Sequence, residues 1–384
     1  MTNAYLDYYA KHKISPVKQD ISDLDKHFYI RKMLYQSLGV PPEFFKDKDV
    51  IEIGPGSGYN SLVTASFNPK HYQLVEANKT GVEDINNLFK KYQLNLNNID
   101  VKNCFIEEFK TNSQFDFAIC ENMLLGIKNN FEVLGKIDSL VKNGGILILS
   151  CSDEISIFYD MTRRLLANIL VHKTKVTGFD EKVLLFVEAF ESHLRTLKGF
   201  NKIPYDWCAD NLMGKALYNS SFAISDVLEF LKDRYDFYQM TPNIIVDERW
   251  HKEIALKQVE FNNYKKSLFE KTWHNFFHYK VMANEREGHQ NIELRKLCRD
   301  YFDLIESSEE EYTVEVKNTI QEKLKSIKEN LLEVNPILIK SIDEVISFLD
   351  SDNITAQSIS NDFKYFKSSF GKGLQYLSLI KHVD

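Results

Sequence analysis

The sequence predicts an α/β protein with a doubly wound, mainly parallel sheet of seven strands. Short apolar runs alternate with helical patterns between residues 49 and 151, which is typical of parallel strands joined by crossover helices. The first apolar run ends at a glycine-rich bend, from Gly54 to Gly58, which suits a sharp turn from strand to helix. Right-handed crossovers then give a Rossmann-like arrangement with helices on both faces of the sheet.

Seven strand-like runs are expected to build this sheet. They are short, rich in β-branched and aromatic residues, and bounded by turn-forming residues. The runs are residues 50–54, 72–77, 99–104, 115–120, 145–151, 235–240 and 243–250. Between them, apolar residues at helical spacing mark two helix faces, one with Val82, Ile85, Leu88 and Tyr92 and one with Phe131, Leu134, Ile137 and Val141.

The pattern divides the chain into five consecutive regions. Residues 1–48 are expected to form an N-terminal helical cap or lid, with an apolar stripe of Ile30, Met33, Leu34 and Leu38 and a capping box of Ser22 and Asp25. Residues 49–151 form the α/β core, and residues 152–234 form a helical insertion. Residues 235–254 complete the sheet, and residues 255–384 form a mostly helical C-terminal region.

The composition limits the partners and the compartment. The 384 residues carry a net charge of −7, which disfavours a nucleic-acid partner because such binding needs a basic surface. The sequence has no apolar stretch of membrane-spanning length and no signal-peptide pattern, so we expect no membrane partner and a cytoplasmic location. The five cysteines form no C-x-x-C pair, and His274 and His278 lack a third ligand, so no metal site is predicted.

The spacing of the glycine bend separates the possible ligands. A nicotinamide fingerprint, G-x-G-x-x-G, needs a third small residue, but Tyr59 or Ser61 occupies that position here. A Walker loop needs a lysine that does not follow. Glu76 ends the second predicted strand about twenty residues beyond the bend, where an acidic side chain can accept hydrogen bonds from ribose hydroxyls. The pair of motifs therefore favours an adenosyl ligand with a free ribose.

The residues Glu52-Ile53-Gly54-Pro55-Gly56-Ser57-Gly58, then Glu76, then FDFAICEN and NGGILILS, resemble the successive motifs of class I S-adenosylmethionine-dependent methyltransferases. The resemblance covers residues 49–151. Further segments, among them HKISPVKQD, SCSDEIS and FGKGLQYLSLIK, resemble parts of larger bacterial methyltransferases. The resemblance implies S-adenosylmethionine as the cofactor, with the glycine bend beside its methionine moiety, Glu76 on its ribose and the segment near Phe105 beside its adenine. The implied cofactor-binding residues are Glu52, Gly54, Pro55, Gly56, Ser57, Gly58, Glu76, Ala77, Ile106, Glu107, Glu121 and Asn122.

Residues outside these motifs are candidates for acceptor binding and catalysis. Asp206, Trp207 and Asp210 lie in a stretch that reads as a loop, where a tryptophan can stack on a planar acceptor or instead anchor the insertion. Arg249 and Trp250 follow the last predicted strand, and Lys372 lies between two glycines, where it meets an anionic group or solvent. The predicted catalytic residues are His251 as a general base, Asp153, which is alternatively a helix cap, and Glu121.

These features predict a methyltransferase that acts on a small molecule or glycan precursor, at oxygen. The acidic charge, the helical insertion and the aspartate and tryptophan residues suit a polyol acceptor in that region. A protein methyltransferase acting on lysine or a carboxylate is the first alternative. A nucleotide-binding oxidoreductase and a catalytically silent module are the others. The helical C-terminal region forms either a lid or the interface of a homodimer.

Overall fold

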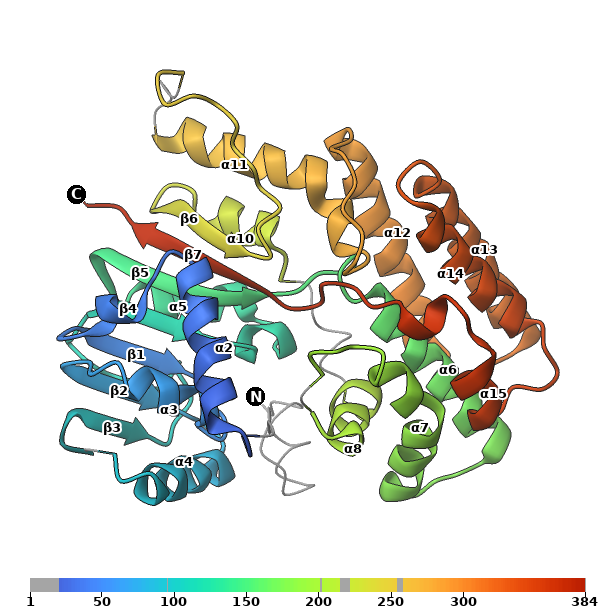
Figure 1. Cartoon of the computed structure of the whole chain (residues 1–384), viewed down its shortest axis with the longest axis horizontal. Helices are drawn as coiled ribbons and strands as arrows, with labels where there is room; N and C mark the ends of the chain where they lie inside the picture. Colours follow the sequence, from blue (N-terminus) through green and yellow to red (C-terminus); the bar gives the residue numbers. More distant parts are fainter. Residues whose placement is uncertain (1–20, 95, 201, 215–221, 254–257, 384) are drawn as a thin grey trace. The chain divides into compact units, whose positions relative to one another are not determined.

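The computed structural model describes residues 21–94, 96–200, 202–214, 222–253 and 258–383. Residues 1–20, which include the proline-broken segment HKISPVKQD, lie outside the described residues. The chain divides into two compact units, coloured along the sequence in Figure 1. Unit 1 comprises Met1–Cys151, Phe222–Lys266 and Leu374–Asp384, and unit 2 comprises Ser152–Ser221 and Ser267–Gly373.

Unit 1 is built on a seven-stranded sheet with the order β3-β2-β1-β4-β5-β7-β6. Its strands are β1 (Asp49–Ile53), β2 (His71–Val75), β3 (Ile99–Lys102), β4 (Phe115–Cys120), β5 (Val141–Cys151), β6 (Tyr235–Thr241) and β7 (Gln375–Lys381). The first five strands are parallel to their neighbours, and β7 pairs antiparallel with both β5 and β6. The order reverses between β1 and β4, which makes their carboxyl ends the switch point where ligands bind in such sheets. The predicted doubly wound fold is confirmed.

One predicted strand was wrong. Residues 243–250 form no regular strand, and the last strand of the sheet is instead β7, near the C-terminus. Leu377 and Leu379 alternate into the core there, and β7 pairs with β5, more than 200 residues earlier in the chain. The seven residues of β7 lie among helical patterns, and so short an apolar run does not by itself indicate a strand that pairs over that distance.

The N-terminal helix α2 (Leu24–Ser37) forms as predicted, but only half of the predicted stripe is buried, since Leu38 lies in the core and Leu34 packs against it. Ile30 and Met33 are each 45% exposed, whereas His27, Arg31 and Tyr35 are buried. Its N-cap is Asp23, whose carboxylate accepts a hydrogen bond from the backbone N–H of Lys26 at 2.9 Å, so the predicted capping box of Ser22 and Asp25 was also wrong. Hydrophobicity alone misplaced the face because the buried arginine has a partner elsewhere in the fold.

The helices α3 (Tyr59–Ala65), α4 (Lys79–Lys91), α5 (Asn130–Asp138) and α10 (Ile224–Leu231) complete unit 1 with the first part of α11 (Gln258–Thr272). Side chains of β1, β2 and β4 share one apolar core with α2, α3 and α4, for example Val50, Leu74, Leu62 and Ile85. This core fixes the strand ends against the two helices that follow the first two strands.

Unit 2 is helical, as predicted for the insertion and the C-terminal region. It contains α6 (Phe158–Thr174), α7 (Phe179–Leu194), α8 (Pro204–Cys208), α12 (Gly288–Ser307), α13 (Val314–Asn330), α14 (Pro336–Leu349) and α15 (Ala356–Asp362). The predicted loop around Trp207 is helical instead, since α8 runs into a π-helical turn at Ala209–Met213. Among the helices of the described residues, none has the length and apolar character that crossing a bilayer requires.

Candidate active site

The glycine bend lies between the end of β1 and the start of α3. Ile53 is in register with Val75 of β2, and the N–H of Gly54 donates to the carbonyl of Val75 at 2.9 Å, so the first two strands are neighbours. Gly56 has a φ of +59°, in the left-handed region that favours glycine. A Cβ at Gly81, in the first turn of α4, would lie 2.7 Å from the carbonyl oxygen of Gly56. Glycine is therefore required on both sides of this close approach.

The carboxylate of Glu76 faces the glycine bend from the end of β2. One oxygen accepts a hydrogen bond from the N–H of Gly56 at 2.8 Å, and the other accepts from the N–H of Asn78 at 2.7 Å. The side chain is buried, and burial raises the pKa of Glu76 while these N–H groups oppose that rise. Since a carboxylate offers about four acceptor positions, capacity remains for a ligand hydroxyl.

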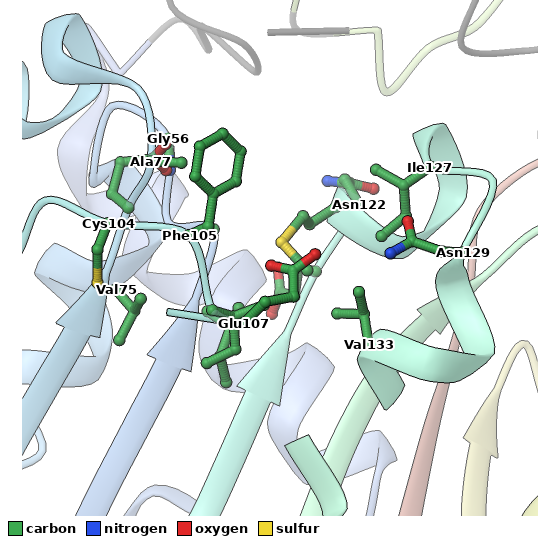
Figure 2. Close-up of a pocket in the computed structure, with 16 residues that line it drawn as sticks. Gly56, Val75, Ala77, Cys104, Phe105, Glu107, Asn122, Ile127, Asn129 and Val133 are labelled. Carbon is green, nitrogen blue, oxygen red and sulfur yellow. The ribbon is translucent and has the colours of Figure 1, made fainter. Parts of the chain in front are cut away.

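A pocket opens at the carboxyl ends of β1, β2 and β4. Figure 2 shows Phe105, from the segment after β3, on the opposite side of the pocket from Ile127 and Asn129, which follow β4, with Glu107 between them. The wall is mostly apolar, with Phe105 38% exposed. The lining residues are Ile53, Gly54, Gly56, Val75, Glu76, Ala77, Cys104, Phe105, Ile106, Glu107, Glu121, Asn122, Met123, Ile127, Asn129 and Val133.

Glu121, the first residue after β4, is fixed by two neighbouring helices. Arg31 of α2 donates from its two terminal nitrogens to the two carboxylate oxygens, at 3.0 Å and 2.5 Å. The side-chain amide of Asn60 in α3 donates to the same carboxylate at 3.2 Å. Burial alone would lower the pKa of Arg31, but the facing Glu121 raises it well above its usual value.

Glu52 is buried in β1, two residues before the bend. It accepts a hydrogen bond from the phenol of Tyr72 in β2. Burial raises the pKa of Glu52 to about 7, the Tyr72 hydrogen bond opposes the rise, and the charge of Glu121 adds to it. Glu52 does not line the pocket, so its contacts are with the strands and helices around the bend.

The sheet order, the glycine bend and the acid that faces it agree with a comparison by sequence. Residues 44–183 match a family model described as a methyltransferase domain. Residues 44–183 therefore form a methyltransferase domain of the S-adenosylmethionine-dependent kind. S-Adenosylmethionine is therefore its cofactor, and the oxidoreductase alternative is set aside.

The methyltransferase resembles proteins of several organisms at low identity. Over 205 residues it is 26% identical to the ribosomal RNA small subunit methyltransferase G of Fusobacterium nucleatum, and the match covers 52% of this chain and 82% of that protein. The N-methyltransferase NodS from Bradyrhizobium japonicum, solved with S-adenosyl-L-homocysteine, is 15% identical with a TM-score of 0.31, over 40% of this chain and 75% of that one. A putative methyltransferase from Thermoplasma acidophilum is 18% identical with a TM-score of 0.25. That match covers 28% of this chain and only 45% of the other.

The pocket brings together eight of the twelve residues expected to bind the cofactor. These are Gly54, Gly56, Glu76, Ala77, Ile106, Glu107, Glu121 and Asn122. Glu52, Pro55, Ser57 and Gly58 are not lining residues, although Gly58 caps the N-terminus of α3 and Ser57 is buried in the bend. Four further lining residues were not predicted, because they lie beyond the motif after β4 and carry no chemical signature of their own: Met123, Ile127, Asn129 and Val133.

The predicted acceptor residues of unit 2 have local partners. Asp153 is fully buried, and its carboxylate accepts from the N–H groups of Ile155 and Ser156 at 2.9 and 3.0 Å, as a cap of the following turn. Lys372 is not a solvated loop lysine. Its ammonium donates to the carbonyls of Asn275, His278 and Val281, and burial lowers its pKa to about 8.

The other candidates of unit 2 lie on α8 and the π-helical turn. Asp210 pairs with Lys202 at 3.3 Å, while Asp206 and Trp207 are half-buried. All three are therefore on short helices rather than in the open loop that the sequence suggested.

Arg249, Trp250 and His251 belong to unit 1 but do not line the pocket. Arg249 makes two hydrogen bonds to Asp247, at 2.8 and 2.7 Å, and lies 3.6 Å above the ring of Tyr264. Trp250 and His251 are exposed and contact each other edge to face. Within the described part of the chain, no group of three metal-ligating side chains comes together.

Proposed function

We propose that this methyltransferase transfers a methyl group to an oxygen atom of a small molecule or glycan precursor. The observation that carries the proposal is the chemistry of the pocket wall. It includes the carboxylates of Glu76, Glu107 and Glu121, and among the described residues none of those that line it is a lysine or arginine. Together with the net charge of −7, this wall disfavours a polyanionic acceptor and suits a neutral, hydroxyl-bearing one.

In this proposal each side of the pocket holds one part of the cofactor. Glu76 accepts from the ribose hydroxyls, and its hydrogen bond to Gly56 couples that contact to the glycine bend. Phe105 and Ile106 cover the adenine ring, because they supply the apolar wall after β3. The bare backbone at Gly54 and Gly56 admits the methionine moiety.

S-Adenosylmethionine supplies a methyl group that is already activated, so the protein contributes mainly by aligning the acceptor. A hydroxyl acceptor must also lose a proton during the transfer. Glu107 is exposed and lies at the pocket, where its carboxylate can take that proton. This role replaces His251 as the favoured base, because His251 does not line the pocket.

A ribosomal RNA acceptor is the second candidate. The Fusobacterium nucleatum relative is named for methylation of the small-subunit RNA, and 26% identity over 205 residues supports a test with RNA. The absence of a nucleic-acid partner is therefore itself part of the proposal. The acidic pocket wall and the net charge favour the small-molecule acceptor over RNA.

Transfer from methyl-labelled S-adenosylmethionine to three separated pools tests the proposal. The pools are low-molecular-weight metabolites, small ribosomal subunits with their RNA, and proteins from a lysate. We expect label in the metabolite pool, in a product whose new methyl group is bound to oxygen by mass spectrometry and NMR. Label confined to RNA would select the second candidate, label confined to protein would select a protein methyltransferase, and cofactor binding without any transfer would select a silent module.

A further inference from the structure

The helix α2 contacts the pocket residue Glu121 through the side chain of Arg31. Arg31 is 5% exposed and contacts Glu121, which is 7% exposed and lines the pocket. The two groups are 90 residues apart in sequence. A second contact docks the same helix on the bend region, since the ring nitrogen Nε2 of His27 lies 2.9 Å from the carbonyl oxygen of Tyr59 at the start of α3. The helix is thus attached at both the glycine bend and the end of β4.

The contact between Arg31 and Glu121 fixes the direction of the carboxylate. A guanidinium that donates two parallel hydrogen bonds to one carboxylate specifies geometry as well as charge, which a lysine does not. The phenol of Tyr35 accepts from Arg31 at 3.2 Å and lies 3.0 Å from the hydroxyl of Thr64, so the arginine is itself held in place. Glu121 therefore has one preferred orientation in the folded protein.

We propose that Arg31 is a positioning residue that holds the carboxylate of Glu121 toward the sulfonium of bound S-adenosylmethionine and thereby makes the pocket selective for the charged cofactor over its neutral thioether product. The inference rests on the proposed placement of the methionine moiety beside Gly54, whose neighbour Ile53 is in register with Cys120, the residue before Glu121. The carboxylate and the sulfonium then lie at the same switch point of the sheet.

The positive charge of the sulfonium explains why a fixed carboxylate distinguishes the cofactor from its product. The sulfonium carries one positive charge and attracts a fixed carboxylate in a pocket of low dielectric constant, whereas the sulfur of S-adenosylhomocysteine is neutral. This attraction is lost when the methyl group leaves, so the fixed carboxylate contributes to binding of the cofactor and not of the product. The other titratable groups that face the pair are Glu52 on β1, Cys120 on β4, His27 and Tyr35 on α2 and Tyr376 on β7.

The test compares the affinities of S-adenosylmethionine and S-adenosylhomocysteine for the full chain by calorimetry, in the wild type and in Arg31→Gln. Without the guanidinium, the carboxylate loses the two hydrogen bonds that fix its direction, so the sulfonium loses a fixed partner. We expect S-adenosylmethionine to bind about tenfold more weakly, as loss of one oriented ionic contact implies, while S-adenosylhomocysteine changes less than about twofold. Arg31→Lys keeps the charge and should recover part of the selectivity.

Arg234→Gln is the matched control, because Arg234 also pairs with a carboxylate of unit 1, Asp138, and neither residue lines the pocket. It should leave the affinity ratio unchanged. A ratio in Arg31→Gln within twofold of the wild type would overturn the inference while leaving the proposed function in place. If Arg31→Gln does not fold, Glu121→Gln removes the charge while keeping the shape, and an unchanged ratio in that variant overturns the inference equally. A wild type that binds neither compound would overturn the proposed function itself.

Discussion

At the scale of single residues, Glu52 shows how the site shapes the stability of the fold. Burial raises its pKa to about 7 in the folded protein, from an ordinary value of 4.5. Below pH 4.5 both the folded and the unfolded state hold the proton. As the pH rises from 4.5 to 7, only the unfolded state releases it, so this group lowers the free energy of unfolding, by up to about 3 kcal/mol, and the loss levels off above pH 7.

Replacement of Glu52 by glutamine removes this titration. The amide oxygen can still accept the hydrogen bond from Tyr72. We therefore expect the free energy of unfolding of Glu52→Gln, relative to the wild type, to increase between pH 5 and pH 7.5. Urea unfolding at several pH values measures it. Glu83→Gln, at an exposed position on α4, is the control and should track the wild type. A difference between wild type and Glu52→Gln that does not change with pH would contradict the prediction.

Glu76 permits a second test at the same scale, directed at cofactor binding. Glu76→Ala leaves the N–H groups of Gly56 and Asn78 without their acceptor and removes the proposed ribose contact. Hydrogen bonds to charged groups contribute about 1.5–3 kcal/mol, so we expect the affinity for S-adenosylmethionine to fall by at least about tenfold. Calorimetric titration measures this change. Glu83→Ala on α4 serves as the control, and an affinity in Glu76→Ala equal to that of the control would exclude Glu76 from the site.

At the scale of elements, the site depends on how closely α4 approaches the glycine bend. Gly81→Ala places a methyl group 2.7 Å from the carbonyl oxygen of Gly56 and 3.2 Å from Cγ of Glu76. The better helix propensity of alanine contributes about 1 kcal/mol of stability, and the clash costs about 1–3 kcal/mol, so overall stability should change little or fall. The bend must shift to relieve the clash, so we expect weaker binding of S-adenosylmethionine and a temperature of thermal unfolding that is unchanged or lower.

Gly199→Ala provides the comparison for this prediction, because a Cβ at Gly199 would meet nothing within 4 Å. Calorimetry and thermal unfolding of both variants separate the two effects. Cofactor affinity equal to the wild type in Gly81→Ala would show that the approach of α4 to the bend is not required for binding.

The elements also show how far the sequence predicts this protein. The strands of the first half, the glycine bend and Glu76 were predictable because their signals are local: an apolar run, a glycine spacing and an acid at a strand end. The strand β7 and the buried face of α2 were not, because each depends on a partner distant in sequence. Arg31 is buried because Glu121 lies opposite, and β7 is a strand because β5 and β6 flank it. The pocket residues after Asn122 were missed because they lie beyond the motif and carry no chemical signature of their own.

At the scale of the whole molecule, unit 1 is assembled from three separate stretches of the chain. The last of these contributes β7, where the hydroxyl of Ser378 donates to the carbonyl of Leu38, just after α2, at 2.8 Å. Tyr376 of the same strand influences the pKa of Arg31. The C-terminal strand therefore supports the helix that positions Glu121, so that the pocket of unit 1 depends on residues from both ends of the chain.

This assembly predicts which segments the cofactor protects from hydrogen exchange. In the part of the chain that the structure describes, the residues that line the pocket belong to unit 1, on segments 53–56, 75–77, 104–107 and 121–133. S-Adenosylmethionine at about one hundred times its dissociation constant should stabilise the folded state by about 2.7 kcal/mol. Hydrogen exchange measured by mass spectrometry should slow most in peptides that cover these segments, and also in α2, because Arg31 joins it to Glu121.

Peptides of α13 and α14 are the internal reference, because none of their residues lines the pocket. These peptides should exchange at the same rate with and without cofactor. S-Adenosylhomocysteine should protect the bend and the segment after β3, but it should protect α2 less than S-adenosylmethionine does. Equal protection of α2 by both compounds would mean that the helix responds to the adenosine moiety alone. Protection confined to α13 and α14 would place the cofactor outside unit 1, because a ligand slows exchange chiefly in the segments that it contacts or whose opening it opposes.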